Sequence, residues 1–256
     1  MQIRNERRRF IFRIAGGVGA LFMAGCERLS RTDWFPKILS VGEPLSSGAQ
    51  HLVASRKSMA QEFSEADLSP QFRSNGTSSP GDAQYQALAA GDFADWALQI
   101  DGLVEHPMKL SLAQLRGMPS RTQITRHDCV EGWSAIGKWK GVPLHEILAL
   151  AQPRSKARYV VFHCADPMED DGSHKYYESV DMEDALHPQT ILAYELNGAV
   201  LPVANGAPIR VRIERQLGYK MAKYIMRIEL VESFAHIGGG KGGYWEDEGY
   251  QWYAGI

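Results

Sequence analysis

Apolar and polar residues alternate over short stretches of the chain from residue 95 onward, and this spacing predicts strands. Trp96, Leu98 and Ile100 alternate with polar neighbours, as in a strand with one buried face. Four further strand-like runs, at residues 123–126, 159–163, 209–213 and 225–231, also predict strands. Helical spacing predicts helices at 112–116, where Ser111 is the cap, and at 142–151 and 182–186.

These elements do not follow a regular strand-helix-strand alternation, so the pattern favours an α+β fold with a single domain. We expect that domain to occupy residues 71–233. Residues 26–70 are irregular and predict a tether with one short helix at 55–63. Residues 234–256 form a glycine-rich and aromatic C-terminal tail.

The first 25 residues differ from the rest, because five arginines precede an apolar run at 14–25. That run covers roughly 18 Å as a helix, less than a hydrocarbon core of about 30 Å, so we expect a signal peptide. Residues 7–11, RRRFI, resemble a twin-arginine export signal, which carries folded proteins to the periplasm. An ordinary secretion signal is the alternative.

The apolar run ends LFMAGC, which resembles the cleavage box of a lipoprotein. In that case Cys26 would accept a lipid and anchor the protein to the membrane. Simple cleavage nearby and an uncleaved anchor are the alternatives.

Composition is that of a globular protein, with 44% hydrophobic and 23% charged residues. Removing residues 1–25 lowers the count from 28 basic and 30 acidic residues to 23 and 29, a net charge of −6. Nucleic-acid binding needs a basic surface, so a nucleic-acid partner is disfavoured.

Beyond Cys26 the chain holds two cysteines, Cys129 and Cys164. An exported protein often pairs such residues in a disulfide. His127 with Cys129 and His163 with Cys164 also suggest a zinc site, and a Cys129 nucleophile with a histidine base is a third hypothesis. Cys129 directly follows a predicted strand, where a soft thiolate suits a transition metal.

Seven segments in order carry a resemblance to one family: 98–105 (LQIDGLVE), 110–115 (LSLAQL), 129–134 (CVEGWS), 139–144 (WKGVPL), 192–198 (LAYELNG), 205–210 (NGAPIR) and 218–223 (GYKMAK). Together they resemble the molybdopterin-binding domain of the sulfite oxidase family over about residues 70–233. The resemblance implies a mixed α+β fold of the sulfite-oxidase type and Mo-molybdopterin as cofactor. It makes Cys129 the catalytic metal ligand.

The resemblance also implies a set of cofactor-binding residues. They are Phe72, Arg73 and Asn75 in a first loop, Cys164, Asn205, the cations Arg210, Lys220 and Lys223, and the backbone of Met221 and Ala222. Cations and backbone N–H groups suit the phosphate and ring oxygens of a pterin. The alternative is that each of these residues is an ordinary solvated charge or part of a turn.

Two positions favour one branch of the family. Asn205 stands where typical sulfite oxidases carry histidine, as in the periplasmic protein-methionine-sulfoxide reductases. Glu131 follows Cys129 closely, and a carboxylate beside the metal would repel sulfite. We therefore expect sulfoxide-type reduction rather than sulfite oxidation, with Glu131 either catalytic or held in a structural hydrogen bond.

The resemblance ends near residue 233, so we expect no C-terminal immunoglobulin-like dimerisation domain. The sequence has no haem-attachment motif, which implies a separate electron carrier such as a cytochrome or a quinone-linked membrane subunit. The substrate would be a small molecule or a protein sulfoxide. Tyr176 and Tyr177 are candidates for the cavity mouth, and the tail is either a partner contact or a lid. A non-catalytic binding or assembly protein that keeps the fold is the alternative function.

Overall fold

The computed structural model describes residue 32 and residues 58–169, 171–172 and 174–256. The chain divides into two units, Met1–Ala54 and Ser55–Ile256, and the fold given below is that of the second. The predicted signal peptide and Cys26 lie outside the described residues. Within the described ranges, no helix is long and apolar enough to cross a membrane.

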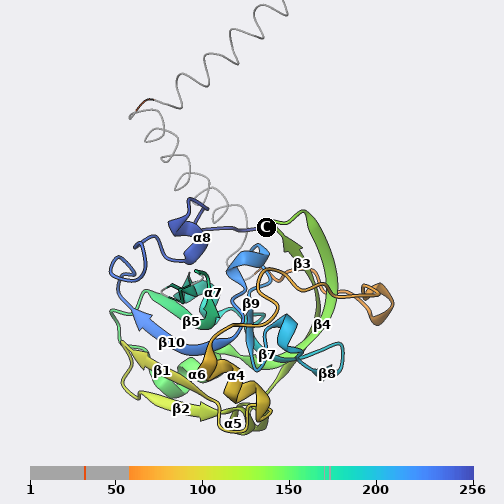
Figure 1. Cartoon of the computed structure of the whole chain (residues 1–256), viewed down its shortest axis with the longest axis horizontal. Helices are drawn as coiled ribbons and strands as arrows, with labels where there is room; N and C mark the ends of the chain where they lie inside the picture. Colours follow the sequence, from red (N-terminus) through yellow and green to blue (C-terminus); the bar gives the residue numbers. More distant parts are fainter. Residues whose placement is uncertain (1–31, 33–57, 170, 173) are drawn as a thin grey trace, which may run out of the picture. The chain divides into compact units, whose positions relative to one another are not determined.

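One sheet has five strands in the order β2 (Met108–Ser111), β1 (Ala97–Gly102), β10 (Ile225–Val231), β5 (Tyr159–Pro167) and β6 (Lys175–Asp181) (Figure 1). β1 and β10 are parallel, and the other pairs are antiparallel. Leu98 and Ile100 are fully buried on one face of β1, as the alternation predicts. The expected strands at 159–163 and 225–231 are confirmed as β5 and β10.

The second sheet is built around a long hairpin of β3 (Arg121–Cys129) and β4 (Trp133–Pro143), followed by β7 (Ile191–Leu196) and β8 (Ala199–Val200). β9 (Arg210–Arg212) pairs with β7. The pattern did not predict β4, where glycines occupy buried positions. A Cβ at Gly141 would lie 2.1 Å from the Leu192 carbonyl oxygen, so this glycine permits the close approach of β7.

The α-helices are short: α4 (Ala83–Ala90), α5 (Leu112–Gly117), α6 (Leu144–Ala151), α7 (Met182–Leu186) and α8 (Tyr244–Asp247). Single 3-10 turns occur at η1 (Glu65–Asp67), η2 (Val203–Asn205) and η3 (Gly218–Lys220). Ser111 caps α5 as predicted, by accepting a hydrogen bond from the Gln114 N–H. α6 begins at Leu144, because the two residues before it extend β4.

The helix predicted at 55–63 is wrong for its described part, because residues 58–63 have no helical turn. The Phe63 N–H donates to the Ile124 carbonyl at 2.8 Å, and the backbone of Ala60 bonds to the Gln189 side chain. Contacts with Ile124 of β3 and with Gln189, which precedes β7, therefore replace the hydrogen bonds that a helix would have formed within this segment.

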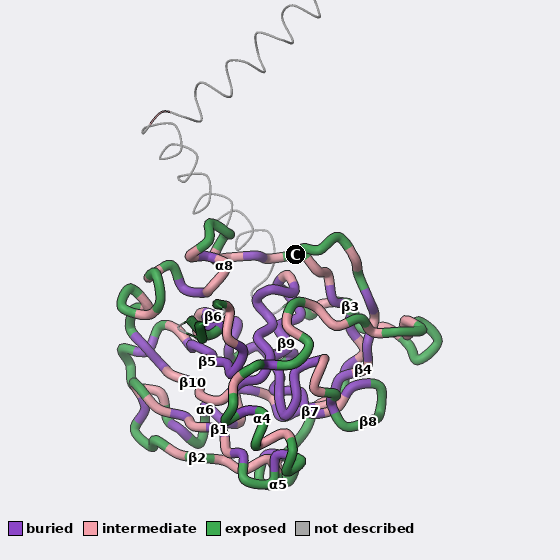
Figure 2. The backbone as a smooth tube through the Cα atoms, in the orientation of Figure 1, coloured by how far each residue is buried: buried purple, intermediate pink, exposed green. Residues whose placement is uncertain are grey.

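The main core includes Trp96, Phe162, Ile209 and Ile228, and a smaller cluster surrounds Trp139. Figure 2 shows that the buried trace gathers around β9 and β7. Residues 205–216 and 218–225 are all buried, although they carry several arginines and lysines. Buried charges need partners or ligands, so this segment directs attention to the site.

Candidate functional site

A cavity of about 260 Å³ opens beside Cys129. Five segments line it: 75–77, the β3–β4 turn, the end of β5 with the start of β6, the η3 segment and the C-terminal tail. The lining residues are Asn75, Gly76, Thr77, Cys129, Val130, Glu131, Asp166, Met168, Tyr176, Gly218, Tyr219, Met221, Ala222, Lys223, Trp245 and Tyr250. The fold thus brings together residues that lie up to 175 positions apart in the sequence.

Cys129 is the last residue of β3 and lies at the tight turn into β4. The turn is closed by the Gly132 N–H, which donates to the Cys129 carbonyl at 3.1 Å, and Gly132 has φ of +84°. Cys129 is half-buried and not in a disulfide. Burial raises the pKa of its thiol above the ordinary value, and the Glu131 carboxylate contributes in the same direction.

The alternatives to a single thiolate ligand lose support. Cys129 and Cys164 are both free cysteines, so the disulfide hypothesis is wrong. Among the residues that the structure describes, no group of three or more His, Cys, Asp and Glu side chains could hold a metal, so the zinc hypothesis gains no support. Cys164 is buried in β5 and borders two other cavities, but it does not line the one beside Cys129.

Glu131 joins the Cys129 turn to the 72–77 segment. One carboxylate oxygen accepts from the Gly76 N–H at 3.2 Å, and the other accepts from the Trp133 indole N–H at 3.0 Å. These hydrogen bonds, that from Trp133 first, lower the pKa of Glu131, so the carboxylate is charged. Both oxygens accept hydrogen bonds, which fits a structural role for Glu131. A catalytic role for Glu131 stays a prediction.

Lys223 reaches the cavity from the buried segment after η3. Its ammonium group donates to the carbonyls of Asn75, at 2.6 Å, and Thr77. Lys223 forms no ion pair with a carboxylate in the part of the chain that the structure describes. Burial lowers its pKa to about 7, and nearby Arg210 adds to the effect. Lys223 is therefore a cation that lacks a counter-anion.

Arg210 lies behind Lys223 and is fully buried. Its guanidinium donates to the carbonyls of Asn205 at 3.1 Å and Met221 at 3.3 Å, and it lies over the Trp139 ring at 5.2 Å. Burial lowers the pKa of Arg210 to about 9. Neither the Nε of Arg210 nor the Nδ2 of Asn205 has a hydrogen-bond partner. Each of these buried nitrogens therefore has a hydrogen that no acceptor receives.

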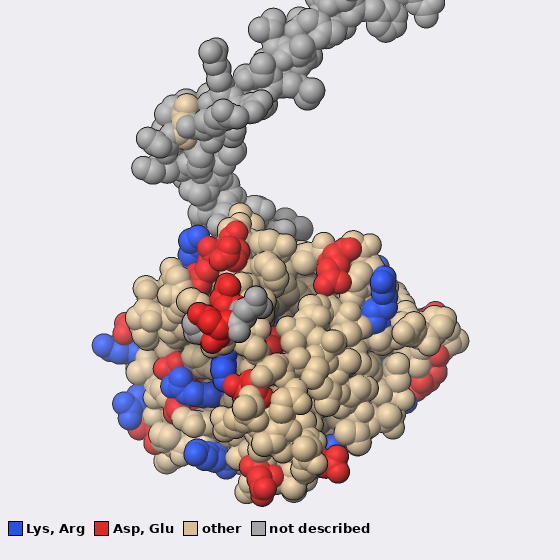
Figure 3. Space-filling view, in the orientation of Figure 1, with Lys and Arg blue, Asp and Glu red and all other residues tan. Residues whose placement is uncertain are grey.

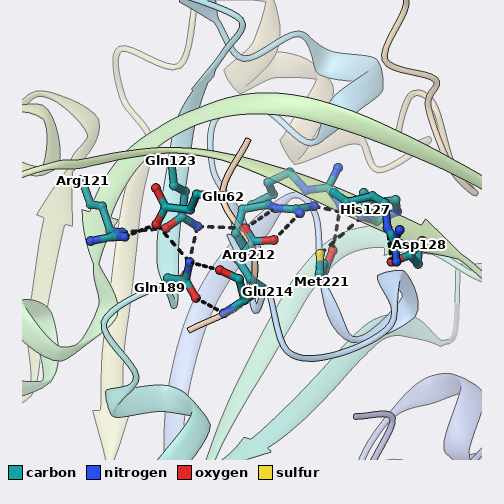
Figure 4. Close-up of polar contacts among 12 residues, drawn as sticks. Glu62, Arg121, Gln123, His127, Asp128, Gln189, Arg212, Glu214 and Met221 are labelled. Carbon is teal, nitrogen blue, oxygen red and sulfur yellow. Dashed lines mark hydrogen bonds and ion pairs between the residues drawn. The ribbon is translucent and has the colours of Figure 1, made fainter. Parts of the chain in front are cut away.

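His127 is a buried residue of the site that sequence reasoning considered only as a zinc ligand. Its Nδ1 lies 2.9 Å from an Arg212 nitrogen and 3.3 Å from the Met221 sulfur (Figure 4). Burial and nearby cations lower the pKa of His127 well below its ordinary value, so the ring is neutral. Arginine can only donate, so Nδ1 accepts and the ring proton is on Nε2, which has no partner.

A polar network holds Arg212 in this position. Glu214 accepts two hydrogen bonds from Arg212, at 2.9 and 2.7 Å, and Gln123 donates to Glu214 at 2.8 Å (Figure 4). Gln189 extends the network by donating to Glu62 at 3.0 Å. The network runs from a half-exposed ion pair at Glu62 to the buried ring of His127 and fixes its orientation.

Lys220 is also buried, but it does not line the cavity. Its ammonium lies 2.5 Å from carboxylate oxygens of both Glu178 and Glu246. The prediction that Lys220 neutralises a cofactor phosphate has no support in this geometry, because two carboxylates already surround the charge. Burial raises the pKa of Glu178 well above its ordinary value.

Other expected residues lie near the cavity without lining it. Phe72 packs edge-on against Trp139, with ring centroids 4.9 Å apart, and Arg73 lies over the Trp133 ring at 5.7 Å. Direct cofactor contact by Phe72, Arg73 or Cys164 stays a prediction. Sequence reasoning missed Thr77, Asp166, Met168, Tyr219, Trp245 and Tyr250 as lining residues. The aromatic composition of the tail was the available signal for the last two.

Asp166 is a missed acidic residue of the cavity. It is 5% exposed, and one of its oxygens has no hydrogen-bond partner. Burial raises the pKa of Asp166 to about 6, so the carboxyl group titrates near neutral pH. No sequence motif marks this aspartate, because its effect depends on burial.

Two polar atoms of the cavity wall, Asn75 Oδ1 and Asp166 Oδ1, are buried without a hydrogen-bond partner. His127 Nε2, Asn205 Nδ2 and Arg210 Nε, from buried residues that do not line the cavity, also lack partners, as do other buried atoms elsewhere such as Trp96 Nε1 and His187 Nε2. Leaving a buried polar atom without a partner costs about 1–3 kcal/mol, so the unpartnered atoms of the cavity wall indicate a polar ligand. Lys223 and Arg210 favour an anionic group, and Cys129 offers a soft ligand to a metal. This donor set fits a pterin with a phosphate and a metal.

Comparison with known proteins agrees with that donor set. The family described as the oxidoreductase molybdopterin binding domain matches residues 85–236. The chain belongs to this family. Mo-molybdopterin is the cofactor of the protein, as the resemblance predicted.

Two individual relatives indicate which branch of the family the chain resembles. It is 44% identical over 164 residues to an Azospira oryzae protein named as a candidate protein-methionine-sulfoxide reductase subunit, YedZ1, covering 64% of this chain and 57% of that protein. It is 41% identical over 145 residues to the Xanthomonas axonopodis pv. citri protein-methionine-sulfoxide reductase catalytic subunit MsrP, covering 54% of this chain and 45% of MsrP. The chain thus spans about half the length of these curated relatives.

A solved structure confirms the fold. The sulfane dehydrogenase SoxCD of Paracoccus pantotrophus matches with a TM-score of 0.50 and 23% identity, over 55% of this chain and 39% of that chain. The predicted mixed α+β, single-domain fold and the likeness to the methionine-sulfoxide reductase branch are confirmed.

Proposed function

We propose that this protein is a molybdenum-dependent oxidoreductase that reduces sulfoxides, and that its substrate is methionine sulfoxide, free or in proteins. One observation carries the proposal: the free Cys129 thiol opens into a cavity lined by Lys223, which has no counter-anion among the described residues, and by oxygens of Asn75 and Asp166 that lack hydrogen-bond partners. The names of two relatives, each a methionine-sulfoxide reductase subunit, support the substrate class.

The described residues divide the work of holding the cofactor. Cys129 would ligate the metal, Lys223 would pair with the phosphate, and the unpartnered groups of Asn205 and Arg210 would bind the remaining polar atoms. When bound, the cofactor supplies two-electron oxygen-atom transfer at a metal. An anionic group of the cofactor would compensate the positive charges of Arg210 and Lys223, which burial separates from water.

The overall reaction consumes two protons and two electrons, since a sulfoxide becomes a thioether and one water is released. Asp166 lines the cavity and, with a pKa of about 6, is half protonated near that pH. It can therefore hold a proton inside the cavity. The electrons would come from a separate carrier, a cytochrome or a quinone-linked membrane subunit.

Charge in the cavity favours a neutral substrate over sulfite. Glu131 and Asp166 both line the wall, and Val130, beside Cys129, is 46% exposed. Two carboxyl groups and an apolar side chain disfavour a dianion, because like charges repel. A dialkyl sulfoxide carries no net charge and has an apolar body.

The test uses purified protein matured with its cofactor and a chemically reduced one-electron dye as the electron source. We expect about one molybdenum per chain and dye oxidation that depends on methionine sulfoxide, with little sulfite oxidation. Zinc in place of molybdenum, or sulfite turnover without sulfoxide reduction, would overturn the proposal. A Mo(V) paramagnetic signal on reduction would argue against the non-catalytic alternative, because a cofactor-free relative cannot give one.

We also propose that the protein acts in the periplasm after export by a twin-arginine signal, with a lipid on Cys26. The support is the arginine-rich, apolar sequence of residues 1–26. Labelling cells with a tritiated fatty acid tests the anchor. Label on the wild-type protein and none on Cys26→Ser is expected, and an unlabelled wild type would refute lipidation.

A further inference from the structure

The C-terminal tail returns to the cavity that holds Cys129. The tail lies beyond the family match, which ends at residue 236, and it contributes Trp245 and Tyr250 to the cavity wall. Sequence reasoning left two roles open for this tail, a partner contact or a lid. The described contacts place part of it at the cavity.

Several bonds fix the tail against the domain. Glu246 of α8 forms its buried ion pair with Lys220, and Asp247 accepts a hydrogen bond from Tyr177 at 2.5 Å. Further along, the Tyr219 hydroxyl donates to the Gln251 carbonyl at 2.5 Å, and the Leu217 N–H donates to the Ala254 carbonyl at 2.9 Å. Side chains between these anchors are thus held in place, which favours a preformed recognition surface.

Trp245 and Tyr250 form an aromatic wall together with Tyr219, which also lines the cavity. The Trp245 and Tyr250 ring centroids are 5.4 Å apart, and the Tyr250 ring meets Tyr219 edge-on at 5.3 Å. Tyr250 is 42% exposed. Exposed Val130 lines the same cavity beside Cys129, so the cavity offers apolar and aromatic surface close to the thiol.

We propose that Trp245 and Tyr250 are the substrate-recognition wall of this enzyme, against which the methyl and sulfur of a methionine sulfoxide side chain pack. The inference rests on the proposed function and adds the residues that select the substrate. Sulfur groups make favourable contacts with aromatic rings, and methyl groups bury well against them. A sulfoxide oxygen remains free to point toward Cys129 and the metal site.

A second cavity borders the first on the side of α8. This cavity, of about 590 Å³, shares Tyr176 with the first and includes Tyr244, Asp247 and Glu248 from α8 and the residue after it. α8 thus contributes to both cavities. Residues that flank the oxidised methionine would occupy the second cavity, whereas a small sulfoxide such as dimethyl sulfoxide would contact only the first.

The experiment compares Trp245→Leu, Tyr250→Leu and the conservative Trp245→Phe in the full-length, cofactor-loaded protein. Kinetics are measured with a short peptide that contains methionine sulfoxide and with dimethyl sulfoxide. Binding of the same peptide with methionine sulfone, which is not reduced in this reaction, is measured separately. Phe234→Leu is the matched control, because Phe234 packs on Tyr159 and Trp252 and lines neither cavity.

We expect each leucine variant to raise KM for the peptide and Kd for the sulfone by about tenfold, with a smaller change in kcat. Trp245→Phe should recover most of the loss, and Phe234→Leu should resemble wild type. Unchanged KM and Kd in both leucine variants, with wild-type sulfoxide reduction intact, would overturn the recognition wall alone. A wild-type protein that reduces no sulfoxide would overturn the proposed function and this inference together.

Discussion

Two walls of the cavity region each contain a buried lysine, and the two lysines differ in what surrounds them. Lys220, under the wall formed by the tail, lies between the carboxylates of Glu178 and Glu246. Lys223, three residues later, lines the cavity, donates to backbone carbonyls and lies over the Tyr224 ring at 4.9 Å, with no carboxylate paired to it among the described residues. Sequence reasoning gave both the same role.

This difference shows that the surroundings of a buried charge indicate its role. A cation that is enclosed by carboxylates is already compensated and holds the structure together. A cation that lacks a counter-anion, with its pKa lowered to about 7 as in Lys223, is compensated only when an anion binds. Surface charge does not separate binding from structural regions in this way, because positive and negative side chains are interspersed on the face shown in Figure 3.

The largest expected effect is on the cofactor side of the comparison. Cys129→Ala should abolish turnover, because it removes the one protein thiolate of the cavity. The fold should survive, since Cys129 is only half-buried at a turn. Activity assays with circular dichroism check this. Retained turnover in a folded Cys129→Ala protein would remove the thiolate from the mechanism.

Lys220→Met tests the structural side. Removing this cation takes away the partner of the buried Glu178 and Glu246 side chains, and breaking a buried pair costs about 3–5 kcal/mol. We expect a loss of that size in the free energy of unfolding, measured with urea on the cofactor-free protein.

A triple variant is the control for Lys220. Glu178→Gln and Glu246→Gln, added to Lys220→Met, replace the carboxyl groups left without a partner and should restore part of the stability. A Lys220→Met protein as stable as wild type, with weakened cofactor binding instead, would show that the two lysines share one role.

Lys223→Met should act in the opposite way. Cofactor retention should fall by about tenfold or more, because a buried charge-assisted hydrogen bond is lost. The cofactor-free protein should not lose stability as Lys220→Met does. Molybdenum content after dialysis, compared with that of Lys220→Met, measures the difference.

The same variant has a pH signature. The pKa of Lys223 is lowered from 10.5 to about 7, so between these values the unfolded chain holds a proton that the folded protein has released. Stability of the cofactor-free protein should therefore rise with pH in this window, by at most about 1.4 kcal/mol per unit. Lys223→Met should flatten that rise. An identical pH profile in the variant would contradict the assignment.

The smallest effect is expected at Glu131. Its two oxygens accept from Gly76 and Trp133, so Glu131→Gln weakens one hydrogen bond and should lower kcat/KM by less than about tenfold. Steady-state kinetics decide the point. A loss of several hundredfold would instead make Glu131 catalytic.

Local patterns predicted much of the fold. The strand at 225–231 and the helix at 182–186 match the structure at both ends, because each depends on local periodicity and capping. The helix at 55–63 failed in its described part, since bonds to Ile124 and Gln189 replace local ones. β4 was missed, because its buried glycines make sense only beside β7 and Phe72.

The sequence by itself determined the family and its cofactor, and it predicted Cys129 as the thiolate ligand, because ordered segments around Cys129 carry the resemblance. Only the tertiary structure decided which buried cation is free to bind an anion and which is already paired. Lys220 is paired by glutamates 42 and 26 residues away, and the aromatic tail reaches the cavity through such contacts. A sequence records each charge, but its pKa and its partner depend on which distant segments bury it.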